Sequence, residues 1–286
     1  MQRKRCPKVL DGALVVVATL SLASSQPYVN YFGSQFAGEA TYYDTQVGAG
    51  HCSFQFSDAP SLQWTQGLTG PRFVGLNRPQ YYDDSGACAA CGMCIAMYGE
   101  QSNLECTTCG DRAYAVPPSV QYLIVSDECP ECETGSLDQA AKGDGRWNIH
   151  WHPVQCDVQD TTFHYAFQGS NDYYIKLTVT NTRVPAAEMR IRVNGSPTYS
   201  SMQKTADNYF VLFSAIPVQL PADVEVTSVF GDIVLDTVAA TSPTSPPVIG
   251  KSNATAHAEW ACESVYQRVL ATKVWGKSFL FRTCVR

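Results

Sequence analysis

The central part of the chain alternates apolar and polar residues with a period of two, as half-buried β-strands do. Two such runs contain Ile175, Leu177, Val179, Met189, Ile191 and Val193. Asn194-Gly195 follows the second run, and this pair favours a tight hairpin because both residues tolerate positive φ. The pattern predicts an immunoglobulin-like β-sandwich over residues 161–240.

Residues 35–160 show a different pattern, in which short strand-like runs are separated by glycine- and cysteine-rich loops. The runs are residues 40–44, 73–77, 94–98, 122–127 and 149–154. Many short strands with turns between them predict a small β-barrel, so the whole chain is expected to be mainly β. A single helix start is expected at Ser136, because Ser136 and Gln139 have the spacing of a capping box.

The two ends of the chain differ from this body. Residues 1–25 are typical of a signal peptide, with basic Arg3 to Arg5, a short apolar core at 12–22 and small residues after it. That core is too short for a stable span and no later apolar stretch is longer, so we expect a secreted, extracellular protein without a membrane span.

At the other end, residues 241–286 are expected to form a linker rich in proline, serine and threonine and then a cysteine-containing tail of unassigned role. The Asn253-Ala-Thr255 sequence is a glycosylation sequon suited to a surface loop, which suggests a glycoprotein. Asn194-Gly-Ser196 is a second sequon, although its role as a turn explains the same residues.

Composition and charge narrow the choice of partners. The chain has 286 residues, of which 45% are hydrophobic, and a formal net charge of −6. An acidic chain offers no broad cationic face for a polyphosphate, so we expect no nucleic acid partner. A neutral or weakly charged ligand fits better, and we expect a monomer without a cofactor.

The cysteines favour disulfides. The chain has 12 cysteines, and removal of Cys6 with the signal leaves an odd number, which implies one unpaired thiol. The remaining cysteines are Cys52, Cys88, Cys91, Cys94, Cys106, Cys109, Cys129, Cys132, Cys156, Cys262 and Cys284. Their pairing cannot be deduced from the sequence.

Metal binding is the alternative interpretation of the same residues. The Cys-x-x-Cys spacings at 88–94 and 106–109 are those of tetrahedral zinc sites, but an exported protein favours disulfides. His150 and His152 would share one face of a strand, yet two histidines make half a metal site. We therefore expect no metal and place both histidines in a groove or on the surface.

Several motifs together resemble expansins and microbial expansin-like proteins, from Gly38 to Val238. In the first unit they are Gly38-Glu-Ala-Thr-Tyr-Tyr43, Cys91-Gly-Met-Cys94-Ile95, Val125-Ser-Asp-Glu-Cys-Pro-Glu-Cys132, Gly135-Ser-Leu-Asp138, Trp151 and Val154. The resemblance implies a six-stranded double-psi β-barrel, like that of family 45 glycoside hydrolases. It implies a polar groove with Thr41, Tyr43, Asp127 and Asp138.

The second unit carries the resemblance further. Gly169-Ser-Asn-Asp-Tyr-Tyr174 and Asn208-Tyr-Phe210 are similar to the expansin carbohydrate-binding domain. This implies that Tyr173, Tyr174 and Tyr209 bind the substrate as an aromatic platform. In a regular strand neighbouring residues alternate faces, so Tyr174 is the more secure platform residue and Tyr173 could pack in the core.

Three positions depart from the pattern of the family. Cys129 stands where bacterial relatives have a groove tyrosine. Tyr173 and Tyr174 stand where tryptophans are usual. The third platform position holds Asp207, with Tyr209 two residues further on. These departures suggest weaker binding or another glucan.

The carboxylates decide between loosening and cutting a glycan. Hydrolysis with inversion needs a protonated carboxyl and a second carboxylate roughly 6.5–9.5 Å away. Asp138 matches the general acid, although a carboxylate at a helix start would have its pKa lowered by the dipole. The matching base position holds Thr45, and Asp44 is displaced by one residue, which turns a side chain to the other face of a strand.

We therefore expect a secreted protein that binds cellulose or a related β-glucan and loosens it without hydrolysis. The alternative is a β-1,4-glucan endohydrolase that uses Asp138 as general acid. A third possibility is a module that only binds the cell wall.

Overall fold

A computed structural model describes residues 31–43, 50–54, 73–99, 120–140, 145–158, 162–243 and 248–253. Some sequence predictions lie outside these residues: those for the signal peptide, Asp44, Thr45, Cys106, Cys109, most of the sequon at Asn253, and the tail with Cys262 and Cys284. Among the residues described, no helix has the length and apolarity that crossing a membrane requires.

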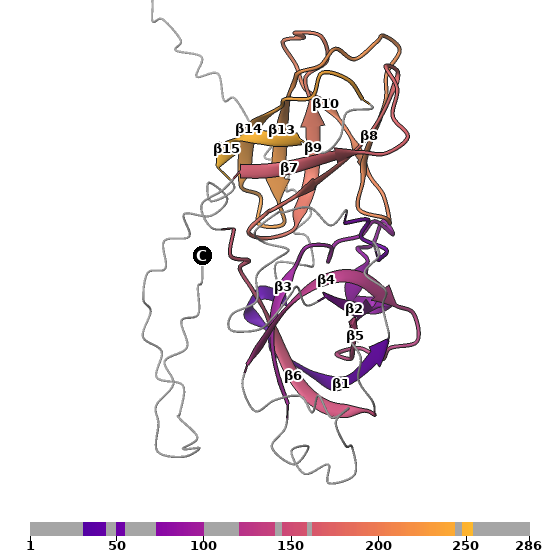
Figure 1. The fold of residues 1–286 in the computed structure, drawn as a ribbon, viewed down its shortest axis with the longest axis vertical. Coiled ribbons are helices and arrows are strands. Elements are labelled where there is room, and N and C mark those ends of the chain that lie inside the picture. The colour runs from indigo at the N-terminus through magenta and orange to yellow at the C-terminus, as the bar shows by residue number, and fades with distance from the viewer. Residues whose placement is uncertain are drawn as a thin grey trace, which may run out of the picture.

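The first unit is a closed barrel of six strands, in the order β1-β5-β2-β4-β3-β6 (Figure 1). The strands are β1 (Phe36–Tyr43), β2 (Phe73–Asn77), β3 (Cys94–Gly99), β4 (Gln121–Cys129), β5 (Leu137–Ala140) and β6 (Trp147–Val154). The pairs β1/β5 and β2/β4 are parallel and the other pairs are antiparallel. Trp151 is fully buried and its indole nitrogen donates to the carbonyl of Gly135 at 2.8 Å.

The second unit consists of two antiparallel sheets. One has the order β10-β9-β13-β14, with β10 (Ser200–Ser201), β9 (Ala186–Ile191), β13 (Ala222–Ser228) and β14 (Ile233–Val238). The other has the order β11-β12-β8-β7-β15, with β11 (Gln203–Lys204), β12 (Phe210–Phe213), β8 (Tyr174–Thr180), β7 (Thr162–Phe167) and β15 (Val248–Asn253). The predicted fold class, a barrel followed by a sandwich, is confirmed.

A turn is present at Asn194-Gly195 as predicted, but it does not join two strands as a tight hairpin, because β9 ends at Ile191 and β10 begins only at Ser200. Asn194 has φ 51° and Gly195 has φ 68°, as a two-residue hairpin turn requires at both central positions. The amide of Ser196 donates to the carbonyl of Val193 at 2.9 Å and closes the turn between β9 and β10.

The helix predicted at Ser136 is wrong, because these residues enter β5. Leu137 and Gln139 point into the barrel, and β5 pairs with β1 on one side and β2 on the other. The hydroxyl oxygen of Ser136 accepts a hydrogen bond from the amide of Glu39 at 3.1 Å instead of capping a helix. Tertiary pairing on both sides of a four-residue segment therefore overrides a local capping signal.

The short helix α2 (Arg78–Tyr81) follows β2 directly. Asn77 caps it, because its side-chain oxygen accepts from the amide of Gln80 at 3.2 Å. The helix directs Tyr81 into the core, and Tyr82 follows at its end. This segment brings two aromatic residues next to the loop at 50–54.

The segment after the sandwich differs from the expected linker and tail. Residues 248–253 form β15, which pairs with β7. The carboxylate of Asp236, which is 5% exposed, accepts from the amide of Lys251 at 2.7 Å and from the hydroxyl of Tyr165 at 3.0 Å. Asp236 thus fixes β15 beside β14, and part of the predicted linker and tail belongs to the sandwich.

The barrel and the sandwich meet over a continuous apolar core, with the barrel below in Figure 1. The side-chain amide of Asn208 donates across this boundary to the carbonyl of Cys52 at 3.3 Å. The amide of Cys88 donates to the carbonyl of Thr205 at 3.2 Å. The loop at 50–54 therefore contacts both units.

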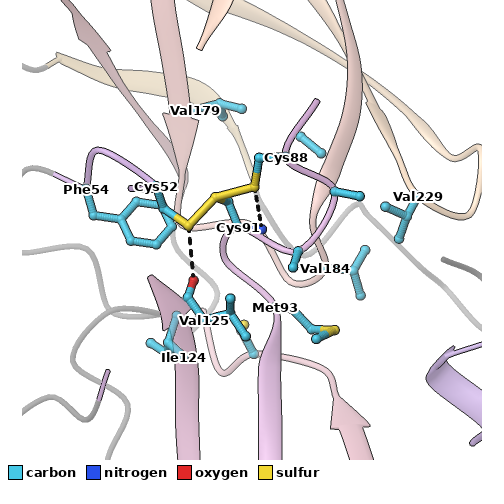
Figure 2. Packing of buried hydrophobic residues seen from close by; sticks show 14 of the residues in the cluster. Cys52, Phe54, Cys88, Cys91, Met93, Ile124, Val125, Val179, Val184 and Val229 are labelled. Carbon is cyan, nitrogen blue, oxygen red and sulfur yellow. Dashed lines mark hydrogen bonds between the residues drawn. A yellow bond between two sulfur atoms is a disulfide. The ribbon is translucent and has the colours of Figure 1, made fainter. Parts of the chain in front are cut away.

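The predicted disulfides are present among the described cysteines. Cys94 bonds to Cys156, and Cys129 bonds to Cys132. The sulfur of Cys91 lies within bonding distance of the sulfurs of both Cys52 and Cys88, all three buried (Figure 2). Because a sulfur atom forms one disulfide, these two pairings are alternatives.

Candidate functional site

A row of paired residues crosses four adjacent barrel strands. Thr41 on β1 pairs with Asp138 on β5, Asp138 pairs with Gly75 on β2, and Gly75 pairs with Asp127 on β4. Directly paired residues place their side chains on the same face of a sheet. The two carboxylates therefore stand on either side of bare glycine backbone, two strand spacings or about 9–10 Å apart at the backbone.

A β-bulge places Asp127 in this row. Val74 pairs with Val125 but the next residue, Gly75, pairs with Asp127, so Ser126 is the extra residue of β4. A bulge re-aims the side chains that follow it. The carbonyl of Ser126 accepts from the amide of Cys52 at 3.0 Å, so the bulge also anchors the loop at 50–54.

Asp138 lies in a half-buried position at the centre of the row. Burial raises the pKa of this carboxyl, and the charge of Glu131 adds to the effect, while the hydrogen bond from the Thr41 hydroxyl to Oδ1 at 2.6 Å opposes it. Because Asp138 lies on a strand, no helix dipole lowers its pKa, in contrast to the alternative weighed from the sequence. The pKa of the Asp138 carboxyl therefore lies above its ordinary value.

Asp127 is held differently. Its Oδ1 accepts from the amides of His51 at 2.7 Å and Glu128 at 2.9 Å, and its Oδ2 accepts from the hydroxyl of Tyr43 at 3.4 Å. Burial and the neighbouring Asp127 raise the pKa of Tyr43, so this hydroxyl remains a donor. A Cβ on Gly50 would lie 2.5 Å from the carbonyl oxygen of Ser126, so the loop can approach Asp127 only with glycine there.

Beyond Asp127 the barrel surface carries polar residues that the sequence did not suggest as site residues. The Tyr82 hydroxyl donates to Glu128 at 2.6 Å, and Arg78 donates to both oxygens of Glu128 at 3.2 Å. Burial of Glu128 is outweighed by Arg78 and Tyr82, so the pKa of its carboxyl is lowered. Only the register of α2 against β4, which the sequence does not reveal, brings these three together.

The loop after Asp127 carries a further carboxylate. Cys129 is buried and bonded to Cys132, so it cannot replace a groove tyrosine. Glu131, between the two cysteines, has an oxygen within 4.8 Å of an Asp138 oxygen. The sequence motif contains Glu131, but only the structure places it beside Asp138.

The outer face of the sandwich carries the exposed aromatic residues. Tyr173 is 53% exposed, and the side-chain oxygen of Asn171 accepts from the amides of Tyr173 and Tyr174 at 2.9 and 3.0 Å. The strand begins only at Tyr174, so the alternation that would have buried Tyr173 does not apply to it. Phe213 pairs with Tyr174 across β12 and β8 and is also exposed.

Tyr209 does not lie on the surface that the sequence analysis expected. Its ring is 1% exposed, and the ammonium of Lys176 lies 4.2 Å from the ring centroid. Lys176 is held there by Asp207 at 2.8 Å. The expected exposed platform residue is therefore covered by an ion pair, because Tyr209 precedes β12 and turns toward the barrel.

Neither His150 nor His152 joins a metal-compatible cluster among the described residues. His150 stacks on Tyr98 with 5.4 Å between ring centroids, on the outer face of β6, and burial lowers the pKa of His152. The groups with metal-compatible spacing are Cys52, Cys88 and Cys91, and Cys129, Glu131 and Asp138. Since cysteines of both groups form disulfides, we assign no metal to either.

Comparisons with known proteins agree with this architecture. Residues 160–250 match the model of the expansin-like protein middle domain. Expansin-like protein 1 of Dictyostelium discoideum is 23% identical over 232 residues, which cover 80% of this chain and 76% of that protein.

Two solved structures share the fold. The apo expansin of Clavibacter michiganensis is 24% identical in sequence, with a TM-score of 0.55. The matched region covers 77% of this chain and 96% of the expansin chain. A mutant of that expansin in complex with cellohexaose is 23% identical, with the same TM-score and coverage. The second unit thus matches the expansin-like middle domain, and the chain as a whole is similar to expansin-like proteins and shares their barrel-plus-sandwich fold.

Proposed function

We propose that this chain is a secreted protein that binds a cell-wall β-glucan, such as cellulose, and loosens it without cutting it. The observation that carries the proposal is the row of Thr41, Asp138, Gly75 and Asp127, in which a raised-pKa carboxyl and a fixed carboxylate, both partly exposed, stand on either side of the buried Gly75. A sugar ring that lies over this row can contact donors and acceptors of both carboxyl groups. The complex of a related expansin with cellohexaose supports this choice of ligand.

Loosening follows from competition for hydrogen bonds. Glucan chains are held together by hydrogen bonds between hydroxyls and by contacts between apolar ring faces. Protonated Asp138 can donate to a hydroxyl of one chain, and Asp127 and Tyr43 can hold the same chain through further polar contacts. Each contact replaces one that the chain makes with its neighbour, so no covalent step is required.

The arrangement of Asp127 suits a positioning role. The amides of His51 and Glu128 and the hydroxyl of Tyr43 hold its carboxylate in one orientation. We therefore assign Asp127 and Thr41 to substrate positioning around Asp138. Tyr173 and Tyr174 are assigned to binding on the sandwich, because aromatic faces suit the apolar faces of glucose rings.

Secretion is part of the same proposal. The disulfides among the described cysteines suit an oxidising compartment, and the signal-like start of the sequence supplies a route to it. Expression of the full chain in a eukaryotic host should yield protein in the medium that lacks the first 25 or so residues. Intracellular retention with an intact N-terminus would contradict secretion. We propose further that the protein acts as a monomer.

Two measurements on the same preparation test the function. Purified protein should lower the force that breaks wet cellulose paper, and it should release no reducing sugar from soluble β-glucan. Asp138→Asn should lose the weakening. Failure of the wild type to weaken paper while it still binds cellulose would reduce the assignment to a wall-binding module.

A hydrolase remains the second candidate, because a raised pKa of Asp138 is also what a general acid needs. Steady release of oligosaccharides, lost in Asp138→Asn, would establish it in place of loosening. Asp44→Asn then tests the remaining base candidate.

A further inference from the structure

Phe213 is the most exposed large hydrophobic residue among those described, with 78% of its surface exposed. It lies directly across from Tyr174 at the end of the β8/β12 pair. The pairing continues in the backbone for one more residue, since the carbonyl of Tyr173 accepts from the amide of Ser214, the residue after Phe213, at 2.9 Å. A strongly exposed and a partly exposed aromatic ring side by side offer a surface patch on which sugar rings can stack.

The rings of this patch do not form one plane. The centroids of Tyr174 and Phe213 are 4.9 Å apart and the ring planes are inclined by 48°. A flat apolar ligand, such as the face of a cellulose crystal, can lie against one of two rings so inclined but not against both. A single glucan chain can rotate about its glycosidic bonds, so successive sugars can each stack on a differently oriented ring.

The neighbouring residue pair on the same face contains a charged side chain and no aromatic ring. Lys176 and Val211 are paired with each other, each two residues from Tyr174 or Phe213, and share their face. Lys176 pairs with Asp207 at 2.8 Å, and the two side chains are 18% and 37% exposed. Further on, the ring of Tyr209 is covered. The aromatic surface is therefore short, and a polar pair able to hydrogen-bond hydroxyls lies beside it.

We propose that this face binds a single, unpacked β-glucan chain rather than the flat face of crystalline cellulose. Phe213 and Tyr174 stack on successive sugars, and the Lys176–Asp207 pair contacts hydroxyls of the same chain. In a crystal those hydroxyls are bonded to neighbouring chains, whereas in amorphous or soluble glucan they are free. This inference rests on the proposed function and adds the physical form of the ligand and the role of Phe213.

The test compares binding of the full chain to amorphous regenerated cellulose and to microcrystalline cellulose, normalised to accessible surface, with calorimetry on cellohexaose. Wild type should prefer the amorphous form, and Phe213→Ala should weaken binding to amorphous cellulose and to cellohexaose by roughly five- to tenfold, the loss of one stacked ring. Ile233→Ala is the matched control, because Ile233 is 61% exposed on the other sheet. That variant should bind as wild type does.

The outcomes separate this inference from the proposed function. Equal or stronger binding to microcrystalline cellulose, or unchanged binding by Phe213→Ala, overturns the inference and leaves glucan binding in place. Absence of binding to every form of glucan overturns both.

Discussion

The hydroxyl of Thr41 donates to Oδ1 of Asp138 at 2.6 Å, between two strands that are paired in parallel. This bond favours the ionised carboxyl, while burial favours the protonated one. Thr41 therefore limits the rise in the pKa of Asp138, and it acts through a hydrogen bond rather than through a charge.

The first prediction concerns the pH dependence of loosening. If protonated Asp138 donates to the glucan, paper weakening should fall as the pH rises through the raised pKa of Asp138. Thr41→Val removes the opposing hydrogen bond, so the pKa should rise further and the decline should move to higher pH. Nuclear magnetic resonance titration of the Asp138 carboxyl measures the pKa shift directly. If the pH dependence of paper weakening is unchanged in Thr41→Val although the pKa of Asp138 has risen, loosening does not depend on the proton of Asp138.

The second prediction concerns Gly75, the buried residue between the two carboxylates of the row. A Cβ there would meet the Glu128 carbonyl oxygen at 3.4 Å, an ordinary contact, so Gly75→Ala should fold with a Tm within about 3 °C of wild type. The added methyl would lie under the surface between Asp138 and Asp127, against Glu128 and Cys129, and would disturb the backbone that holds Asp127 in the row. Paper weakening should drop several-fold while retention on cellulose by the sandwich persists; full activity in Gly75→Ala would show that the close packing at Gly75 is not needed for loosening.

The third prediction concerns the attachment of β15. Asp236→Ala removes three acceptor contacts, from Tyr165, Lys251 and Thr237, and should lower the free energy of unfolding by about 2–4 kcal/mol. Limited proteolysis should then cut the chain near residues 244–253. Asp232→Ala, on a loop of the same sandwich, serves as control and should resist cleavage like wild type.

The fourth prediction concerns the cysteines around Cys91. Cys52 and Cys88 compete for one partner, so Cys52→Ser and Cys88→Ser should each leave Cys91 in the other disulfide. Peptide mapping after alkylation without reductant should find about one free thiol in wild type and one fewer in each variant. A gain of a thiol in Cys88→Ser would mean that Cys88 pairs with a different cysteine.

The fifth prediction concerns Lys204, whose ammonium donates to the carbonyl of Ala186 at 2.5 Å. Burial lowers its pKa to about 8, with Asp83 opposing the shift, whereas the unfolded chain keeps a value near 10.5. The unfolded state therefore binds more protons between these values, and the free energy of unfolding should rise as the pH goes from 8 to 10.5. Denaturation at several pH values measures this slope, and Lys204→Met should flatten it.

The sequence predicted the architecture well because its strongest signals are local. Alternation of apolar residues fixes the sandwich strands, and Asn194-Gly195 fixes a turn. Thr41 and Asp138 are 97 positions apart in the chain. From the sequence only the resemblance to a known family placed them in one site, and the structure shows that they are hydrogen-bonded.

The failures have one physical cause, which is pairing between distant segments. Ser136 and Gln139 have a helical capping pattern, yet β1 and β2 enclose the segment and make it a strand. Tyr209 is aromatic at a plausible platform position, but Lys176 and the barrel cover it. Phe213 was missed because its exposure depends on where β12 ends and not on its neighbours in sequence.

The place of β15 at the edge of its sheet has a practical consequence for handling the protein. In the order β11-β12-β8-β7-β15, the strand that bears Phe213 lies toward one edge and β15 forms the other. A reporter or immobilisation tag fused directly after Asn253 would therefore begin on the side of the sheet remote from the aromatic patch. Surface-tethered protein should keep that patch turned toward the solution, which makes single-molecule measurements on glucan chains feasible with this end as the handle.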